Sequence, residues 1–232
     1  ERQLASSIGA FREIVDDFTV GKPIDAGVEE SSTELEYAGT LPENEVYALS
    51  QNLRSLYNKL GEIDTKFDRF YAELTRLLGS EPSRKVIVYS FFRRTLAYLH
   101  RRLSRAGHRV EVIHGGKGVA ERQGIIDRFR QDDDLRILLS SEVGAEGLDF
   151  QFCDTMVNYD LPWNPMRVEQ RIGRIDRYGQ RSEKVRIISF FLSDTIEERI
   201  LQRLYQRIGV FEESIGALEP MLGEIVRDLS YD

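Results

Sequence analysis

The 232-residue sequence contains a single cysteine, Cys153, and only three histidines. One cysteine excludes an internal disulfide and fits a reducing compartment, and with so few histidines we expect no metal site. No apolar run approaches the roughly 18 residues of a membrane span, and no signal peptide is recognisable. We therefore expect a soluble globular protein that does not bind membranes. Because the chain begins at Glu1 without methionine, we also expect it to be part of a longer one.

The acidic charge is unevenly distributed. The chain has 32 Lys+Arg and 39 Asp+Glu, a net charge of −7. Residues 1–80 contain 8 of the basic and 15 of the acidic residues, which leaves 24 of each in the remainder. The C-terminal part is therefore neutral overall, and arginines clustered on it can still bind a phosphate backbone.

Three segments are expected before residue 79. Residues 1–20 carry a helical apolar stripe, and residues 21–44 are acidic, contain two prolines and are typical of a linker. Residues 45–78 are predicted to form one long helix, because a heptad spacing runs from Val46 to Leu77, about 48 Å at 1.5 Å per residue. Its apolar positions are Val46, Leu49, Leu53, Leu56, Leu60, Ile63, Phe67, Phe70, Leu74 and Leu77.

The pattern leaves open what covers this apolar seam. Packing against the chain's own helices is the simplest interpretation, because phenylalanines in the seam suit irregular packing. An intermolecular coiled coil and a protruding lever are the alternatives.

A second region is expected from 84 to 208, after a boundary at Gly79–Ser83. Short β-branched strands alternate with helices, which predicts an α/β fold with a parallel sheet and helices on both faces. The functional loops of such sheets lie at the carboxyl ends of the strands, where Ser90, His114 and Ser141 fall. Residues 209–232 are expected to form a helical tail. The strands are predicted at 85–89, 110–113, 136–139, 155–159 and 185–190, and the helices at 93–106, 119–130, 165–178 and 195–208.

The stretch from 137 to 180 carries the strongest functional pattern. A buried-looking strand leads into a glycine-punctuated loop, and a second strand is followed by a predicted helix that begins at Pro165. Four arginines on that helix are spaced four, three and three residues apart, so they share one face. Guanidinium groups suit phosphate oxygens, which predicts a phosphate site. The arginines are Arg167, Arg171, Arg174 and Arg177.

At these residues the chain resembles a known family. The run LLSSEVGAEGLDF resembles motif V of superfamily 2 helicases and translocases, and EQRIGRIDRYGQ resembles their motif VI. The closing residues Arg177–Gln180 resemble the Swi/Snf branch, especially the bacterial ATPase that associates with RNA polymerase. The resemblance covers about 85–191, although Glu142 and Glu146 depart from the common pattern of motif V.

This resemblance implies a RecA-like second motor lobe, with ATP and Mg²⁺ held mainly by a first lobe elsewhere in the parent chain. It implies arginine fingers at Arg174 and Arg177, a role that stabilises charge on a transferring phosphoryl group. The implied nucleotide-binding residues are Gly147, Asp149 and Gln170, and the implied nucleic-acid contacts are Ser90, His114, Gly115 and Ser141.

The chain has no phosphate-cradling loop of its own. In His114–Gly118, the nearest imitation, glycine stands where the hydroxyl residue is required. We therefore expect no ATP hydrolysis by this chain alone. The implied partners are double-stranded DNA, the first lobe and a protein target such as RNA polymerase, and the implied location is the bacterial cytoplasm, at the nucleoid.

Several alternatives stay open at this stage. The arginines could pair with Glu169 or Asp176 on a solvated helix, Asp149 could be a cap, and His114 could be a surface residue. The parent could be an RNA helicase, or the lobe could be a non-catalytic module that binds nucleic acid or protein.

Overall fold

The structure is a computed structural model. It describes residues 6–19, 52, 54–55, 58, 63–162, 165–176, 178–180, 182, 184–191, 198–199 and 202. The linker expected at 21–44 and the tail expected at 209–232 lie outside these residues. Among the described residues, no helix is long and apolar enough to cross a membrane.

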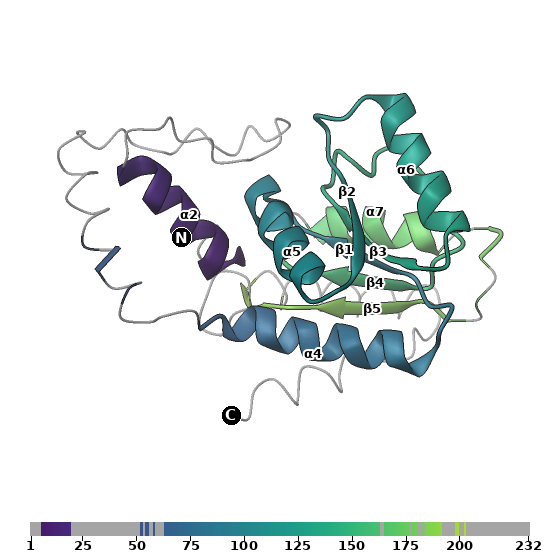
Figure 1. Ribbon diagram of the computed structural model, residues 1–232. Helices are drawn as coiled ribbons and strands as arrows, with labels where there is room; N and C mark the ends of the chain where they lie inside the picture. The colour runs from purple at the N-terminus through teal and green to yellow at the C-terminus, as the bar shows by residue number, and fades with distance from the viewer. Residues whose placement is uncertain are drawn as a thin grey trace.

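A sheet of five parallel strands forms the centre of the molecule (Figure 1). In chain order the strands are β1 (Val86–Tyr89), β2 (Arg109–Ile113), β3 (Leu135–Ser140), β4 (Thr155–Asn158) and β5 (Arg186–Ser189). Their spatial order is β2-β3-β1-β4-β5, with β1 paired in parallel to both β3 and β4. All carboxyl ends therefore meet at one edge of the sheet, where ligand sites of such folds are built.

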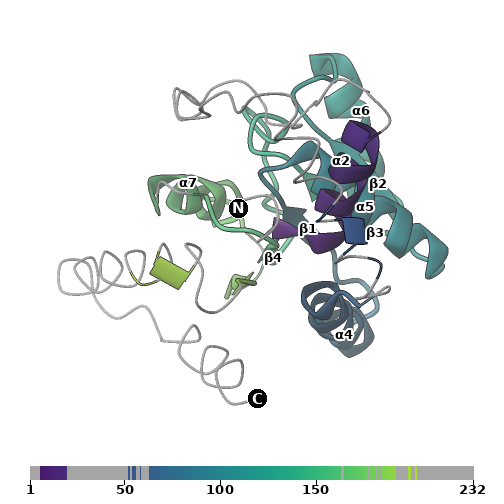
Figure 2. The same ribbon diagram turned by 90° about the vertical axis from the view of Figure 1, so that its left-hand side faces the viewer.

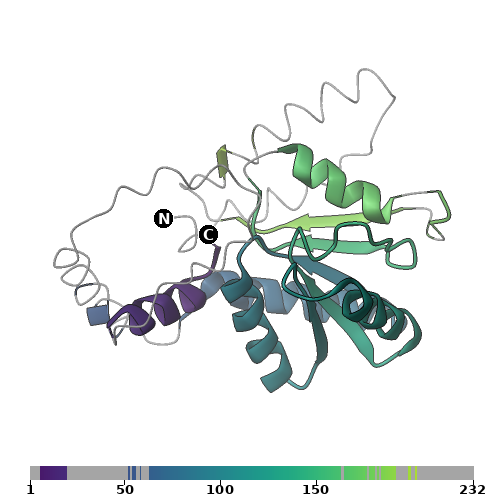
Figure 3. The same cartoon turned by 90° about the horizontal axis from the view of Figure 1, so that it is seen from above.

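The helices are α2 (Ile8–Thr19), α4 (Thr65–Ser80), α5 (Arg93–Arg105), α6 (Val119–Gln131) and α7 (Pro165–Ile175). One hydrophobic core joins the sheet to α4 and α5, and a second joins it to α6 and α7. Figure 3 shows α7 on the opposite side of the strands from α2 and α5. The predicted α/β fold with helices on both faces is thus confirmed.

The central strand shows why both faces must be covered. Val86 and Val88 point into the core with α4 and α5, whereas Ile87 and Tyr89 point into the core with α6 and α7. All four are fully buried, so the strand is a continuous apolar run rather than an alternating one. The predicted limits of the five strands agree with the observed ones to within one residue at each end.

The predicted continuous helix over 45–78 is wrong. Helix α4 begins at Thr65, and Asp64 before it has a non-helical backbone (φ −138°, ψ 84°). The Asp64 side chain accepts a hydrogen bond from Phe67 N at 2.9 Å, which is the geometry of a helix N-cap. The heptad spacing continues across Asp64 without interruption. Apolar spacing alone therefore did not reveal that a helix begins there. Ile63, a predicted seam position, is 63% exposed.

Helix α4 belongs to the lobe itself, so the boundary expected at Gly79–Ser83 is also wrong. Phe67, Phe70, Leu74 and Leu77 are buried in the core beneath the sheet. Of the alternatives for the seam, packing within the chain is therefore correct for this part of it, because α4 shares its core with the sheet.

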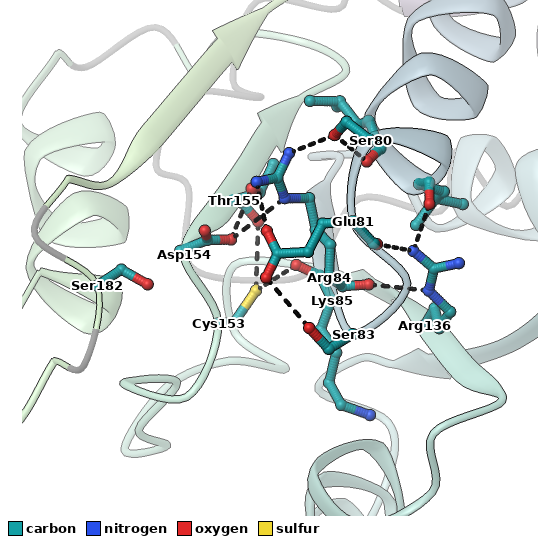
Figure 4. A network of polar contacts seen from close by, with 12 residues as sticks. Ser80, Glu81, Ser83, Arg84, Lys85, Arg136, Cys153, Asp154, Thr155 and Ser182 are labelled. Carbon is teal, nitrogen blue, oxygen red and sulfur yellow. Dashed lines mark hydrogen bonds and ion pairs between the residues drawn. The ribbon is translucent and has the colours of Figure 1, made fainter.

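The short connection from α4 to β1 is held by a polar network at the amino ends of the strands (Figure 4). The Arg136 guanidinium donates to the backbone oxygens of Leu78, Glu81 and Arg84 at 2.7, 2.6 and 3.0 Å. Arg84 in turn donates to Glu81 Oε2 at 2.7 Å and lies 3.8 Å from Asp154. A cation at the carbonyl end of a helix also interacts favourably with the helix dipole, which strengthens this attachment.

Helix α2 lies against α5 (Figure 2), and its acidic residues meet the arginines of that helix. Arg94 Nη1 contacts Asp17 Oδ2 at 2.7 Å, and Arg101 pairs with Glu13. The Arg102 guanidinium lies 4.1 Å above the Phe67 ring. Arg94, Arg101 and Arg102 of α5 therefore contact neighbouring helices.

Replacing Asp64 with alanine should lower the free energy of unfolding by about 2 kcal/mol, because Asp64 caps α4 and its Oδ2 also accepts from Tyr98 OH at 2.7 Å. Urea denaturation would show this as a lower midpoint with an unchanged slope. Asp64→Asn is the matched control, because asparagine caps equally well and should lose far less stability. Equal midpoints for the wild type and Asp64→Ala would contradict the capping role.

Candidate functional site

The residues singled out by sequence gather at the carboxyl edge of the sheet. Ser90 follows β1, His114 follows β2, and Ser141 follows β3. Two backbone hydrogen bonds join these loops, because Ser90 N donates to Ser140 O at 3.1 Å and Ser141 N donates to Ile113 O at 3.0 Å. The edge is therefore one continuous surface of neighbouring loops.

The loop from Ser141 to Asp149 is shaped by two glycines. A Cβ at Gly144 would lie 2.7 Å from His114 Cα and 2.7 Å from Ile113 O, so only glycine allows the loop to pack against the end of β2. Gly147 has φ +75°, which favours glycine, and nothing lies within 4 Å of the position its Cβ would take. Gly147 and Asp149 are both exposed, so this part of the loop is open to a ligand.

Helix α7 is held against the same loop by its arginine. Arg174 Nη1 donates to Ala145 O at 2.6 Å, and Phe150 N donates to Arg174 O at 3.2 Å. Gln170, one turn earlier, is exposed. The structure thus brings Arg174 beside the loop that carries Gly147 and Asp149. Arg177 lies outside the described residues.

Arg167 and Arg171 both contact Glu142, and only Arg171 is buried. Arg167 Nη1 lies 3.2 Å from Glu142 Oε2, and Arg171 Nη2 lies 3.7 Å from the same oxygen. Arg171 is 1% exposed and donates to Asn158 Oδ1 at 2.8 Å, with its guanidinium 5.0 Å above the Tyr89 ring. Burial raises the pKa of Tyr89 far above its ordinary value, so the ring stays neutral beneath the cation. Arg171 is therefore a buried structural residue, whereas Arg167 stays partly exposed beside Glu142.

The hydroxyls of Ser90 and Ser141, two of the predicted nucleic-acid contacts, are buried and make hydrogen bonds within the lobe. Their contact with nucleic acid stays a prediction. Ser90 is fully buried, and its hydroxyl donates to Asp160 Oδ2 at 2.5 Å. Ser141 is 1% exposed, and its Oγ accepts from Gly144 N at 3.0 Å. Both hydroxyls shape the loops from beneath, because small polar side chains at strand ends readily satisfy backbone groups of the next turn.

His114 and Gly115 lie at the surface of the edge, as a ligand contact requires. His114 is half-buried and its Nδ1 accepts from Gly116 N at 3.1 Å, while Gly115 is exposed. Arg93, the first residue of α5, is close by, with Nη2 3.5 Å from the position that a Gly116 Cβ would take. The structure therefore places the positively charged Arg93 side chain near His114 and Gly115.

Asp160 is a site residue that sequence reasoning missed. It follows β4, is 2% exposed, and accepts from Phe91 N at 2.7 Å in addition to the Ser90 hydroxyl. An aspartate directly after an apolar strand was the available signal, but its partners are 69 and 70 residues away in sequence. No local pattern links them.

Comparisons with known proteins agree with this geometry. Residues 66–179 match the helicase conserved C-terminal domain. The chain is 42% identical over 141 residues to an uncharacterised ATP-dependent helicase, YqhH, from Bacillus subtilis (strain 168), an alignment that covers 61% of this chain and 25% of that protein. The chain thus spans about a quarter of the length of this curated relative.

Two solved structures resemble the fold. The C-terminal part of the Fun30 ATPase domain matches with a TM-score of 0.57 and 23% identity, covering 82% of this chain and 64% of that one. The C-terminal domain of the DEAD-box protein Dbp5 matches with a TM-score of 0.50 and 30% identity, covering 62% of this chain and 78% of that one. The matched domain starts at residue 66, which agrees with the placement of α4 inside the lobe. Residues 66–179 therefore belong to the family of helicase conserved C-terminal domains, and the sheet with its helices has the RecA-like fold of those lobes.

Proposed function

We propose that this chain is the second motor lobe of an ATP-dependent translocase of the Swi/Snf type that moves along double-stranded DNA. The observation that carries the proposal is the contact between Arg174 and the loop that bears Gly147 and Asp149. An arginine, an exposed carboxylate and an open glycine then lie together at the carboxyl edge of a parallel sheet.

On the nucleotide side, Arg174 and Arg177 would face the γ-phosphate of an ATP held mainly by the first lobe together with Mg²⁺. Their fixed charge would stabilise the negative charge that builds on the phosphoryl oxygens during transfer. Asp149 would accept hydrogen bonds from the ribose hydroxyls, and Gln170 would line the same face. The residues present suit such a ligand, because Asp149, Gln170 and Gly147 are all exposed.

On the nucleic-acid side, we propose His114, Gly115 and Arg93 as the backbone contacts. These residues lie at the surface, whereas Ser90 and Ser141 lie beneath it. Phosphate contacts position a protein on DNA without reading its sequence, which suits a motor that must move along any sequence. The motifs also resemble those of the bacterial ATPase that associates with RNA polymerase, so RNA polymerase is a candidate protein target.

An RNA helicase lobe is the second candidate, because the chain is 30% identical to the C-terminal domain of the DEAD-box protein Dbp5. The closing Arg177–Gln180 run favours the Swi/Snf type.

Steady-state ATP hydrolysis by the full-length parent protein tests both candidates. We expect strong stimulation by double-stranded DNA and little by RNA, whereas preferential stimulation by RNA would favour the helicase. The isolated 232-residue chain should not hydrolyse ATP, because it lacks the phosphate-cradling loop. Hydrolysis by the isolated chain that does not depend on Arg174 would contradict the two-lobe proposal.

A further inference from the structure

The Asp160 carboxylate connects three separate parts of the chain. Its Oδ1 accepts from Phe91 N at 2.7 Å, and its Oδ2 accepts from the hydroxyls of Ser90 and Ser6, each at 2.5 Å. Ser90 and Phe91 form the turn between β1 and α5, and Ser6 lies just before α2. Asp160, Ser90 and Ser6 are all at least 98% buried.

Burial makes this contact important for the position of the N-terminal segment. A buried carboxylate is tolerated when hydrogen-bond donors replace water, and here Ser6 supplies one of the three donors. The Ser6 Oγ also lies 3.0 Å from Thr95 Oγ1, so it is attached to α5 as well. Helix α2 then continues along α5 through the pairs Asp17–Arg94 and Glu13–Arg101.

The backbone of Asp160 connects the same point to α7. Arg171 Nη1 donates to Asp160 O at 3.5 Å and to Asn158 Oδ1 at 2.8 Å. The Nε and Nη2 atoms of Arg171 are buried and make no hydrogen bond among the described residues. Both hydrogen bonds that the Arg171 guanidinium makes among the described residues therefore end on the Asn158–Asp160 segment, which makes this segment one of the supports of α7.

We propose that Asp160 is a positioning residue that couples docking of the 6–19 segment to the placement of α7, the helix that carries Gln170 and Arg174. Release of Ser6 removes a donor from the carboxylate and loosens the Asn158–Asp160 segment on which Arg171 rests. An effect on catalysis rests on the proposed function. The coupling between residues 6–19 and α7 does not depend on it. The proposal gives residues 6–19 a role in fixing the position of α7.

Hydrogen–deuterium exchange of the full-length parent protein tests the coupling without reference to activity. In Ser6→Ala we expect amides of residues 165–176 to exchange about five- to tenfold faster, the effect of losing one buried hydrogen bond. Ser7→Ala is the matched control. Ser7 is an equally buried neighbour whose hydroxyl accepts from Ala10 N at 3.1 Å, within its own segment. Ser7→Ala should loosen only the first turn of α2 and leave α7 unchanged, because Ser6 still donates to Asp160.

Replacement of Asp160 gives the second arm. Asp160→Ala should have the larger effect on α7 exchange, and Asp160→Asn, which can still accept from Phe91 N, should restore most of the protection. Asp160→Ala and Ser6→Ala should also lower kcat for ATP more than they change KM, because α7 is displaced rather than the nucleotide-holding lobe. If Asp160→Ala does not fold, the exchange of α7 amides in Ser6→Ala and Asp160→Asn still tests the coupling.

Unchanged α7 exchange in Ser6→Ala, or equal changes in Ser6→Ala and Ser7→Ala, would overturn the proposal. If exchange responds as expected but the parent protein hydrolyses no ATP, the coupling stands and the proposed function fails.

Discussion

Replacing Arg174 with alanine in the full-length parent protein should reduce DNA-stimulated ATP turnover by at least about a hundredfold, the low side of an arginine-finger effect. Arg174 lies beside the loop of Gly147 and Asp149, with Nη1 2.6 Å from Ala145 O. Removal of its guanidinium takes away positive charge that the transition state needs more than the bound substrate does. Steady-state hydrolysis at saturating DNA measures the effect, and Arg177→Ala should behave alike.

ATP and DNA affinity should change far less than turnover, because in the proposed two-lobe motor the first lobe would hold most of the nucleotide and several backbone contacts would share the DNA affinity. Arg174→Lys should restore little activity, since one ammonium cannot reproduce a planar guanidinium.

The control for charge is Arg109→Ala. Arg109 lies at the amino end of β2, opposite the site, and pairs with Asp132 at 2.7 Å. Arg93 cannot serve as this control, because it lies beside Gly116 and is one of the proposed nucleic-acid contacts. Full activity of Arg174→Lys, or equal damage from Arg109→Ala, would show that the finger assignment is wrong.

Phe70→Ala should destabilise the lobe by about 3–5 kcal/mol, the range for a fully buried phenylalanine. Phe70 is 0% exposed and packs edge-on against Tyr159 and Phe190, with ring centroids 5.2 and 5.8 Å away. Its removal would leave a cavity between α4 and the sheet. Chemical denaturation of the 232-residue chain measures the loss as a lower midpoint.

Ile63→Ala is the matched control, because Ile63 occupies another position of the same heptad pattern but is 63% exposed. Its effect should be within about 0.5 kcal/mol, as for most surface substitutions. Comparable losses at both positions would mean that the seam continues through Asp64 as the heptad spacing predicts, and that α4 does not begin where the structure places it.

Much of the fold and part of the site could be predicted from local pattern. The strands were predicted to within a residue at each end because each is a short β-branched run between turn residues. The start of α7 at Pro165 follows from the fixed φ of proline, which suits a first helical turn. The sequence also indicated a glycine-punctuated loop, and the close approach at Gly144 and the positive φ of Gly147 explain two of its glycines.

What the sequence alone determined is therefore local: the limits of the five strands, the start of α7, and the position of Ser90, His114 and Ser141 at the ends of strands. Only the tertiary structure decided what covers each apolar face and which polar groups become partners. The heptad spacing showed that Phe70 lies on an apolar stripe but not that the sheet covers it. Ser90 and Ser6 contact Asp160 across 70 and 154 residues. The physical reason is that periodicity reports the environment of a residue, whereas the identity of a distant partner depends on how the whole chain packs.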